Sequence, residues 1–284
     1  MKLGAIWIAS ILTLWAGGPQ LDQARTLYQL TEFEKSLHLL QAIPEPARDG
    51  AAWELIGKNY YGLADYKKAT EALEKAIAAE PGNAEFHLWA GRAYGRRAET
   101  SSLITAPGYA SKARQFFEKA AQLNPRSLDA QSDLFEYYLE APGFLGGGQD
   151  KAATAAARIA RIDPAEGFWA QAKIAEKRKE YSSAEAHLRQ AIDLTPEQIG
   201  RFIDLARLLT KQGRIQEADQ SIARAEQIAP DSPKLIFAKA DLYIKTGRNL
   251  AAARDLLRRY LSMKLSPDDP PRSHAEKLLK QLVG

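Results

Sequence analysis

The sequence predicts an all-α solenoid, a stack of paired helices that share one continuous core. Three observations indicate this fold class. Eight spaced positions recur along the chain with a period of 34 residues. The apolar residues in each copy have the i, i+3, i+4, i+7 spacing of one helix face, and a proline closes most copies. Because two short helices cannot bury their apolar faces alone, neighbouring copies must stack.

Each copy contains two helical stretches separated by a short turn. Small residues in the pattern let the two helices approach closely, and larger residues fill the space between them. The four clearest copies are Trp53, Ile56, Gly57, Tyr60, Ala69, Leu73, Ala76, Pro81; His87, Ala90, Gly91, Tyr94, Ala113, Phe117, Ala120, Pro125; Phe168, Gln171, Ala172, Ala175, Ala184, Leu188, Ala191, Pro196; and Phe202, Leu205, Ala206, Leu209, Ala218, Ile222, Ala225, Pro230.

Three further copies are weaker, and the last of them lacks the closing proline. They are Ala24, Leu27, Phe33, Ser36, Leu40, Ile43; Gln131, Leu134, Phe135, Tyr138, Ala152, Ala156, Ile159, Pro164; and Ile236, Lys239, Ala240, Tyr243, Ala252, Leu256, Arg259. The segment 272–283 carries Ala275, Leu278, Leu279 and Leu282 on one stripe. We expect it to form a helix that covers the last open core face.

These positions resemble the motif of the tetratricopeptide repeat family: a large residue, Leu, Gly or Ala, and Tyr, then Ala, a large residue, Ala and Pro. The resemblance covers roughly residues 50–264. It implies a right-handed α-solenoid, or superhelix, of six to seven two-helix repeats with a C-terminal capping helix. It also implies a concave groove, lined by the first helix of each repeat, that binds a peptide or protein.

The N-terminal segment 1–18 has the layout of a secretory signal peptide. Lys2 supplies a positive start, residues 3–16 are almost wholly apolar, and small residues precede Pro19. The alternatives are an uncleaved anchor or an apolar first helix. The chain contains no cysteine, so it cannot carry the lipid of a bacterial lipoprotein. The sequence thus predicts an exported bacterial protein, periplasmic or secreted, with a solenoid over residues 19–284.

Composition argues against nucleic acid as a partner. The formal net charge is only +4, and acidic and basic residues are interspersed along the chain. The hydrophobic content of 45% is enough for a continuous core. The mature chain is predicted to have no membrane-spanning segment.

Two copies contain insertions between their first and second helices, predicted as loops near residues 97–111 and 140–150. Related strings occur in both, Ala-Pro-Gly-Tyr ending at Tyr109 and Ala-Pro-Gly-Phe ending at Phe144. Equivalent loops of a solenoid emerge along the same edge, so we expect the two loops to be neighbours. Tyr109 and Phe144 are candidate anchors for a partner or for self-association; the alternative is a stiff turn with no binding role.

A second stripe beside the core stripe is predicted to line the groove. The stripe runs at i, i+4 and i+7 along the first helix of each copy. Its first position is apolar in four copies, and its second position, four residues later, is Lys or Arg in four copies. Such a surface suits a peptide with hydrophobic and acidic side chains or a free carboxylate. The alternative is that the apolar members pack against the following repeat. The candidate groove residues are Lys58, Tyr61, Leu88, Arg92, Glu136, Trp169, Lys173, Ile203, Arg207 and Phe237.

The sequence offers no catalytic cluster. The four histidines lie far apart in the repeat frame, and no metal-ligand spacing is present. The glycines at 146–148 and Lys151 do not match a nucleotide-binding loop. Two residues separate the last glycine from the lysine, and no strand is predicted before the glycines. We therefore predict no catalytic, metal or cofactor residues, and a non-catalytic scaffold for envelope assembly or transport complexes. The alternatives are a self-assembling structural protein that uses the inserted loops, possible as a homo-oligomer, and a substrate-capture module of an envelope enzyme.

Overall fold

The computed structural model describes residues 18–282, and helices in antiparallel pairs make up nearly all of this part of the chain. There is no strand within these residues. Seven consecutive pairs are followed by a single helix, α15 (Arg272–Gln281). The predicted signal peptide lies outside the described residues, apart from Gly18, which begins the first helix. The predicted all-α repeat architecture is confirmed.

The first helices of the pairs are α1 (Gly18–Gln29), α3 (Gly50–Gly62), α5 (Ala84–Glu99), α7 (Leu128–Glu140), α9 (Pro164–Lys177), α11 (Ile199–Lys211) and α13 (Pro233–Lys245). The second helices are α2 (Phe33–Ala42), α4 (Tyr66–Ala79), α6 (Ala106–Leu123), α8 (Gln149–Ile162), α10 (Tyr181–Leu194), α12 (Ile215–Ile228) and α14 (Leu250–Ser262). Two short 3₁₀ turns occur, η1 (Glu45–Ala47) and η2 (Gly143–Leu145).

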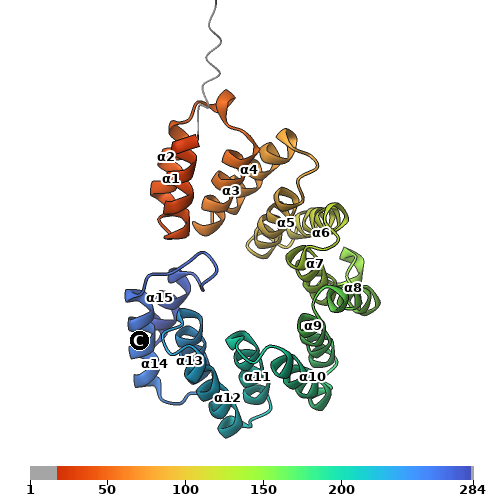
Figure 1. Cartoon of the computed structure of the whole chain (residues 1–284), viewed down its shortest axis with the longest axis vertical. Helices are drawn as coiled ribbons and strands as arrows, with labels where there is room; N and C mark the ends of the chain where they lie inside the picture. The colour runs from red at the N-terminus through yellow and green to blue at the C-terminus, as the bar shows by residue number, and fades with distance from the viewer. Residues whose placement is uncertain (1–17, 283–284) are drawn as a thin grey trace, which may run out of the picture.

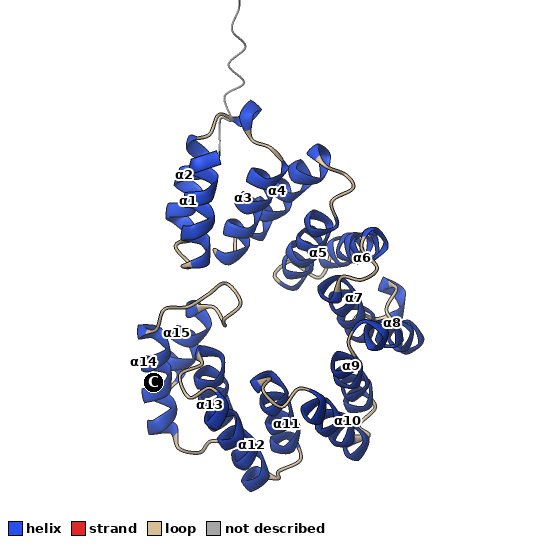
Figure 2. Ribbon diagram, viewed as in Figure 1, coloured by secondary structure: helices blue, strands red, loops and turns tan. Residues whose placement is uncertain are grey.

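The pairs follow one another around an arc (Figure 1). From α3 to α13 the first helices lie on the inside of the arc and the second helices on the outside (Figure 2). The arc brings the last helices back toward the first pair. Among residues 18–282, none of the helices is long and apolar enough to cross a bilayer.

Local sequence signals explain where several helices begin. The carboxylate of Asp49 accepts a hydrogen bond from the backbone N–H of Ala52, with 2.8 Å between nitrogen and oxygen. The carboxylate of Asp65 accepts one from the N–H of Lys68 at 3.1 Å. Asp163 likewise accepts two N–H groups at the start of α9. Each such cap satisfies a donor that the helix itself leaves unpaired.

The two helices of a pair pack through one small residue and one large residue. Gly91 of α5 faces Phe117 of α6 so closely that a Cβ at position 91 would lie 2.5 Å from the phenyl ring. In α7 and α8 the sizes are reversed, because Phe135 is fully buried and Ala156 takes the opposite position. The total volume between the helices is thus kept, although the pattern looks degenerate in the sequence.

The register of the last pair differs from the predicted one by a single residue. The core residues of α14 are Ala253, Leu257 and Tyr260, all fully buried, whereas the sequence pattern assigned Ala252, Leu256 and Arg259. The turn between α13 and α14 is the reason. It contains Asn249, whose φ of 47° lies in the left-handed region, in addition to the left-handed Gly247. One extra turn residue moves every later core position forward by one.

The insertions also differ from the predicted loops. The first one mainly lengthens two helices, since α5 continues to Glu99 and α6 begins at Ala106, so that the loop is only 100–105. Tyr109 therefore lies in α6. In the second insertion, η2 (Gly143–Leu145) contacts α6, and the following residue, Gly146, lies beside the Arg114 side chain of that helix. The two insertions therefore both involve α6.

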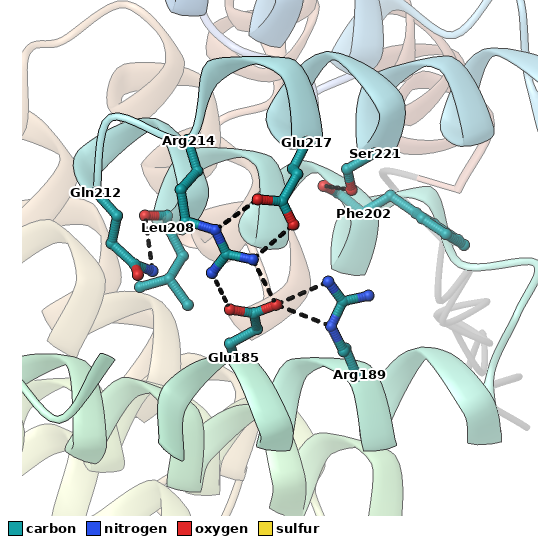
Figure 3. Close-up of polar contacts among 8 residues, drawn as sticks. All are labelled: Glu185, Arg189, Phe202, Leu208, Gln212, Arg214, Glu217 and Ser221. Carbon is teal, nitrogen blue, oxygen red and sulfur yellow. Dashed lines mark hydrogen bonds and ion pairs between the residues drawn. The ribbon is translucent and has the colours of Figure 1, made fainter. Parts of the chain in front are cut away.

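Neighbouring pairs are also joined on their outer side by ion pairs. Glu185 of α10 accepts hydrogen bonds from Arg214, which precedes α12, and from Arg189 at 2.7 Å (Figure 3). Arg214 also donates to Glu217 at 2.6 Å. Hydrogen bonding to Arg214 holds the pKa of Glu185 below its ordinary value. Ser221 donates to the carbonyl of Phe202 at 2.8 Å and ties α12 to α11 (Figure 3).

Candidate interaction surface

The inner surface of the arc is joined from helix to helix by polar contacts. Lys58 of α3 lies 3.3 Å from Glu85 of α5, and Lys177 of α9 lies 2.6 Å from Glu140 of α7. Lys211 of α11 lies 3.2 Å from Glu176 of α9. These pairs link the first helices of successive repeats, so part of the charge on this surface is neutralised within the chain.

Aromatic rings and cations occupy the N-terminal part of this surface. Trp89 lies between Lys58, whose Nζ is 4.8 Å from the ring centroid, and Arg92, whose Cζ is 5.0 Å away. Tyr61 meets Trp89 edge to face at 5.5 Å, and burial raises the pKa of Tyr61. Lys58 also pairs with Glu54 at 2.7 Å. The predicted groove residues Lys58 and Tyr61 thus form a packed cluster.

Arg92 is engaged by the following repeat. Its Nε lies 2.5 Å from an Asp133 oxygen, and a terminal nitrogen lies 3.6 Å from Asp129. Burial raises the pKa of Asp133, and the Arg92 charge opposes that change. Because this guanidinium already has two carboxylates, it is a weaker attraction for an acidic ligand than the sequence suggested.

Three predicted groove residues are buried between helices. Leu88, Ile203 and Phe237 are at most 4% exposed, and each belongs to a core cluster that includes residues of neighbouring helices. Phe237, for example, contacts Tyr260 and His274 at centroid distances of 5.3 and 5.1 Å. Their apolar character therefore reflects packing between repeats, which is the alternative that the sequence left open.

Trp169 is half-buried and joins α9 to α11. Its indole N–H donates to Asp204 at 3.0 Å, and its ring meets Phe135 edge to face at 5.9 Å. The ring is flanked by Lys173 and Arg201, at 5.6 and 5.4 Å from its centroid. Trp169 thus fixes the position of Lys173 on the inner surface.

Three candidate groove residues have charges that few neighbouring side chains neutralise: Glu136, Lys173 and Arg207. They occupy equivalent positions on three successive first helices, α7, α9 and α11. Within residues 18–282, Glu136 and Lys173 form no ion pair, and Arg207 has only Asp204 of its own helix, at 3.5 Å. Desolvation by the surrounding protein and the nearby Asp133 raise the pKa of Glu136, although its side chain is exposed, while Lys173 opposes this change. We call these three residues the central charged row.

The two loop-edge candidates have different surroundings. Tyr109 lies against Arg97, whose Cζ is 4.2 Å from its ring centroid, and is only partly exposed. Phe144 in η2 is 83% exposed. The largest apolar exposure lies elsewhere, at Leu103 (93%) and Ile104 (91%) in the loop that precedes α6. Sequence reasoning missed this pair, although adjacent aliphatic residues among Ser and Thr in a turn were a visible signal.

The glycine loop at 146–148 is held by its own backbone. The N–H groups of Gly146, Gly147 and Gly148 donate to carbonyls of Gly143, Pro142 and Tyr138. Lys151 donates to the Gly146 carbonyl at 2.8 Å. These amides and the lysine are therefore engaged and do not form a phosphate cradle.

The side chains that could carry catalysis or hold a metal are dispersed. In the described part of the chain, no group of three or more acidic or histidine side chains is placed to hold a metal ion. His87 is buried, with Nε2 2.9 Å from the Pro81 carbonyl oxygen. His187 stacks on Phe168 at 6.1 Å. Both rings have structural contacts.

Comparison with known proteins identifies the repeats. A family model described as "Tetratricopeptide repeat" matches residues 54–127 and 203–270, which together make up half of the chain. The chain belongs to the tetratricopeptide repeat family. Tetratricopeptide repeat (TPR) proteins are in general non-catalytic modules for protein–protein interaction, so a scaffold role follows from membership. No curated protein matches the chain.

Solved TPR structures share the fold at low identity. A TPR protein from Parabacteroides merdae matches with a TM-score of 0.61 and 14% identity, covering 95% of this chain and 99% of its own. A thermophilic TPR protein from Thermus thermophilus matches with a TM-score of 0.56 and 19% identity, covering 69% and 100%. The assembly chaperone of RpL4 (Acl4) matches with a TM-score of 0.52 and 15% identity, covering 81% and 96%. These matches establish the superhelical TPR fold.

Proposed function

We propose that this TPR protein is a scaffold that holds an extended protein segment across the central charged row. The proposal is supported chiefly by the contrast among equivalent positions. Lys58 and Arg92 each pair with carboxylates of the next repeat, whereas Glu136 and Lys173 form no ion pair within residues 18–282. A charged side chain that has no ion-pair partner can attract a ligand without first breaking an internal ion pair.

The charges of the row define the chemistry of the partner. Lys173 and Arg207 suit acidic side chains or a C-terminal carboxylate, and Glu136 suits a basic side chain. The segment would lie across α7, α9 and α11, with Trp169 supplying a flat apolar contact between the charges. This refines the acidic peptide predicted from the sequence to a segment with acidic groups at one end and a basic group at the other.

Affinity capture from an envelope extract tests this function with a matched control. The test variant is Lys173→Glu/Arg207→Glu. The control is Lys119→Glu/Arg224→Glu, which makes the same change in net charge on the outer helices α6 and α12, where both residues are exposed. We expect the wild type and the control to retain the same protein, and the test variant to lose it. Equal capture by all three would reject the proposed site.

Self-assembly is a second candidate, supported by the exposure of Leu103, Ile104 and Phe144. Contact between copies would bury these three side chains, which are the most exposed large apolar residues in the described chain. Native mass at several concentrations tests it. Replacement of all three by Ser should remove a concentration-dependent oligomer. The same replacement at Leu194, Ile228 and Leu250, which are 41–52% exposed, should leave it intact.

We also propose that the protein works in the bacterial envelope, in assembly or transport complexes. The support is the signal-peptide pattern of residues 1–18 and the absence of cysteine. Cell fractionation of the full-length chain, with N-terminal sequencing of the product, tests this location. A cytoplasmic product that still begins at Met1 would reject it.

A further inference from the structure

The hairpin formed by α5 and α6 projects beyond its neighbours at the turn that joins its two helices. α5 is 16 residues long, against 13 in α3 and α7, and α6 is 18 residues long, against 14 in α4 and α8. Trp53 and His87 each lie three residues after the start of a first helix. Ala76 and Ala120 each lie three residues before the end of a second helix. The extra residues are therefore all at the turn, which extends about 5 Å beyond the turns of the adjacent pairs.

Two aliphatic side chains occupy the tip of this hairpin. The Ser102 carbonyl accepts hydrogen bonds from the N–H groups of Thr105, at 3.0 Å, and of Ala106, at 2.9 Å. These bonds close a turn that has Leu103 and Ile104 at its centre. Both side chains are almost fully exposed. The backbone thus holds two apolar groups in solvent at the projecting end of the hairpin, where contact with a partner would bury them.

The turns within the third, fourth and fifth pairs form one edge of the superhelix, and this edge is basic. η2 contacts α6, and Arg178 donates to Gln149 at 2.9 Å, so the three turns follow one another. The segments 96–112, 140–151 and 177–181 together contain seven Lys or Arg and four Asp or Glu. We call these three segments the basic edge.

The opposite edge of the same repeats is acidic. It consists of the turns that join one pair to the next, in segments 79–85, 123–129, 162–166 and 193–199. These segments contain seven Asp or Glu and one Arg. The two edges therefore carry net charges of opposite sign, and the apolar tip belongs to the basic one.

Several cations of the basic edge have no carboxylate partner. Within residues 18–282, Arg178 and Lys179 form no ion pair, and both are exposed. Arg97, close to the apolar tip, contacts the Thr70 hydroxyl and the Tyr109 ring but no carboxylate in this part of the chain. These charges can bind anionic groups without first breaking an internal ion pair.

We propose that the basic edge docks on the surface of a bilayer that contains anionic phospholipid. Leu103 and Ile104 insert below the headgroups, and the cations of the edge lie against the phosphates. Apolar side chains beside Lys and Arg are the combination that binds peripheral proteins to such surfaces. A second copy of the chain, the other candidate partner of this tip, fits less well, because a symmetric contact would bring two basic edges together. The docking does not depend on the central charged row.

A fluorescent label in this cysteine-free chain tests the docking. An environment-sensitive dye would be attached to Leu103→Cys and, as the control, to Leu194→Cys, an exposed position at the end of α10 on the acidic edge. We expect vesicles of phosphatidylglycerol and phosphatidylcholine to shift the emission to shorter wavelength at position 103 and not at position 194. Vesicles of phosphatidylcholine alone should require at least about tenfold more lipid for the same shift. The segment 1–17 is present in both proteins, so any binding of its own to vesicles is common to them.

A pair of charge variants tests the contribution of the cations. Arg178→Gln/Lys179→Gln should raise the lipid concentration that gives half of the shift at position 103 by about tenfold. Lys119→Gln/Arg224→Gln removes the same charge from exposed positions on α6 and α12 outside the basic edge, and should leave that concentration unchanged. Circular dichroism of each variant verifies that the helices are retained.

Three results would overturn the docking. One is no shift at position 103, or an equal shift at both labelled positions, which would show that this edge does not meet the bilayer. Another is a shift at position 103 that grows with protein concentration without vesicles, which would assign the tip to a second copy. The third is equal binding by both charge variants, which would remove the role of the cations. None of these measurements involves partner capture, so failure of the docking and failure of the proposed binding site can be told apart.

Discussion

Gly91 and Gly95 lie four residues apart in the same helix, α5, and the structure predicts opposite effects when each is replaced by Ala. A Cβ at position 91 would lie 2.5 and 2.6 Å from two carbons of the Phe117 ring. A Cβ at position 95 would have no atom within 4 Å outside its own helical surroundings. Neither glycine has a positive φ. The two sites thus differ in packing and not in backbone conformation.

The magnitudes follow from two opposing effects. Replacing Gly by Ala inside a helix stabilises it by about 0.5–1 kcal/mol, because Ala loses less conformational freedom on folding. Overpacking of a filled core costs about 1–3 kcal/mol. We therefore expect Gly95→Ala to raise the free energy of unfolding by about 0.5–1 kcal/mol. Gly91→Ala should lower it by up to about 2 kcal/mol, since the clash exceeds the gain.

The difference between the two variants isolates the clash, because both share the gain in helix propensity. Urea unfolding followed by circular dichroism measures it, provided that the m-values of the variants agree. The double variant Gly91→Ala/Phe117→Leu should recover about 1 kcal/mol relative to additivity. The fifth repeat already has this combination, because Ala172 and Leu188 are both buried at the positions that correspond to Gly91 and Phe117. Equal stability of Gly91→Ala and Gly95→Ala would refute the packing argument.

Two further predictions concern turns and pH. Ala64 has a φ of 60° at a turn where the sixth repeat has Gly213 with a φ of 75°, so Ala64→Gly should stabilise and Gly213→Ala should destabilise the fold by about 1 kcal/mol each, as measured by urea unfolding. A stability change of the same sign in both variants would contradict the assignment of these turns. The pKa of Glu185 is lowered in the folded protein, chiefly by hydrogen bonding to Arg214, so its stabilising effect is full above its unfolded pKa and is lost as pH falls through the folded pKa. The Tm difference between the wild type and Glu185→Gln should therefore be clear at neutral pH and shrink as the pH falls below about 4, and a difference that does not depend on pH would contradict it.

The fold could be predicted because it depends on a local and repeated signal. Small residues such as Ala69, Ala184 and Ala218 are nearly or fully buried at the positions where the pattern required close helix contact. The capping helix was also predicted, since Ala275 and Leu278 on its apolar stripe are buried. One helix pair needs only its own residues and those of the next pair, so a single sequence contains the necessary information.

The register of the last pair could not be read with the same certainty. A one-residue change in a turn leaves the helical spacing intact, so both Ala252 and Ala253 fit a small-residue position. Only the buried Tyr260, which replaces the expected small residue at the end of the pattern, distinguishes them. Only the residue type of Asn249 indicates in the sequence that its backbone adopts a left-handed conformation.

The candidate surface was predicted only in outline. The sequence placed a basic slot on the inner helices, but it could not show that Lys58 and Arg92 are paired with carboxylates of the next repeat. These contacts depend on how far each repeat rotates relative to its neighbour, which the period alone does not define. The same rotation determines that Leu88 and Phe237 are buried while Lys173 is partly exposed.

Site-specific photo-crosslinking in living cells tests the central claim most directly. A photoreactive amino acid would replace Glu136, Lys173 or Arg207 in turn, and Gln190, an exposed residue of the outer helix α10, would serve as the control position. The account predicts that at least two of the three inner positions capture the same protein and that position 190 does not. Capture of that protein from position 190, with none from the inner positions, would show that the partner binds the outside of the superhelix.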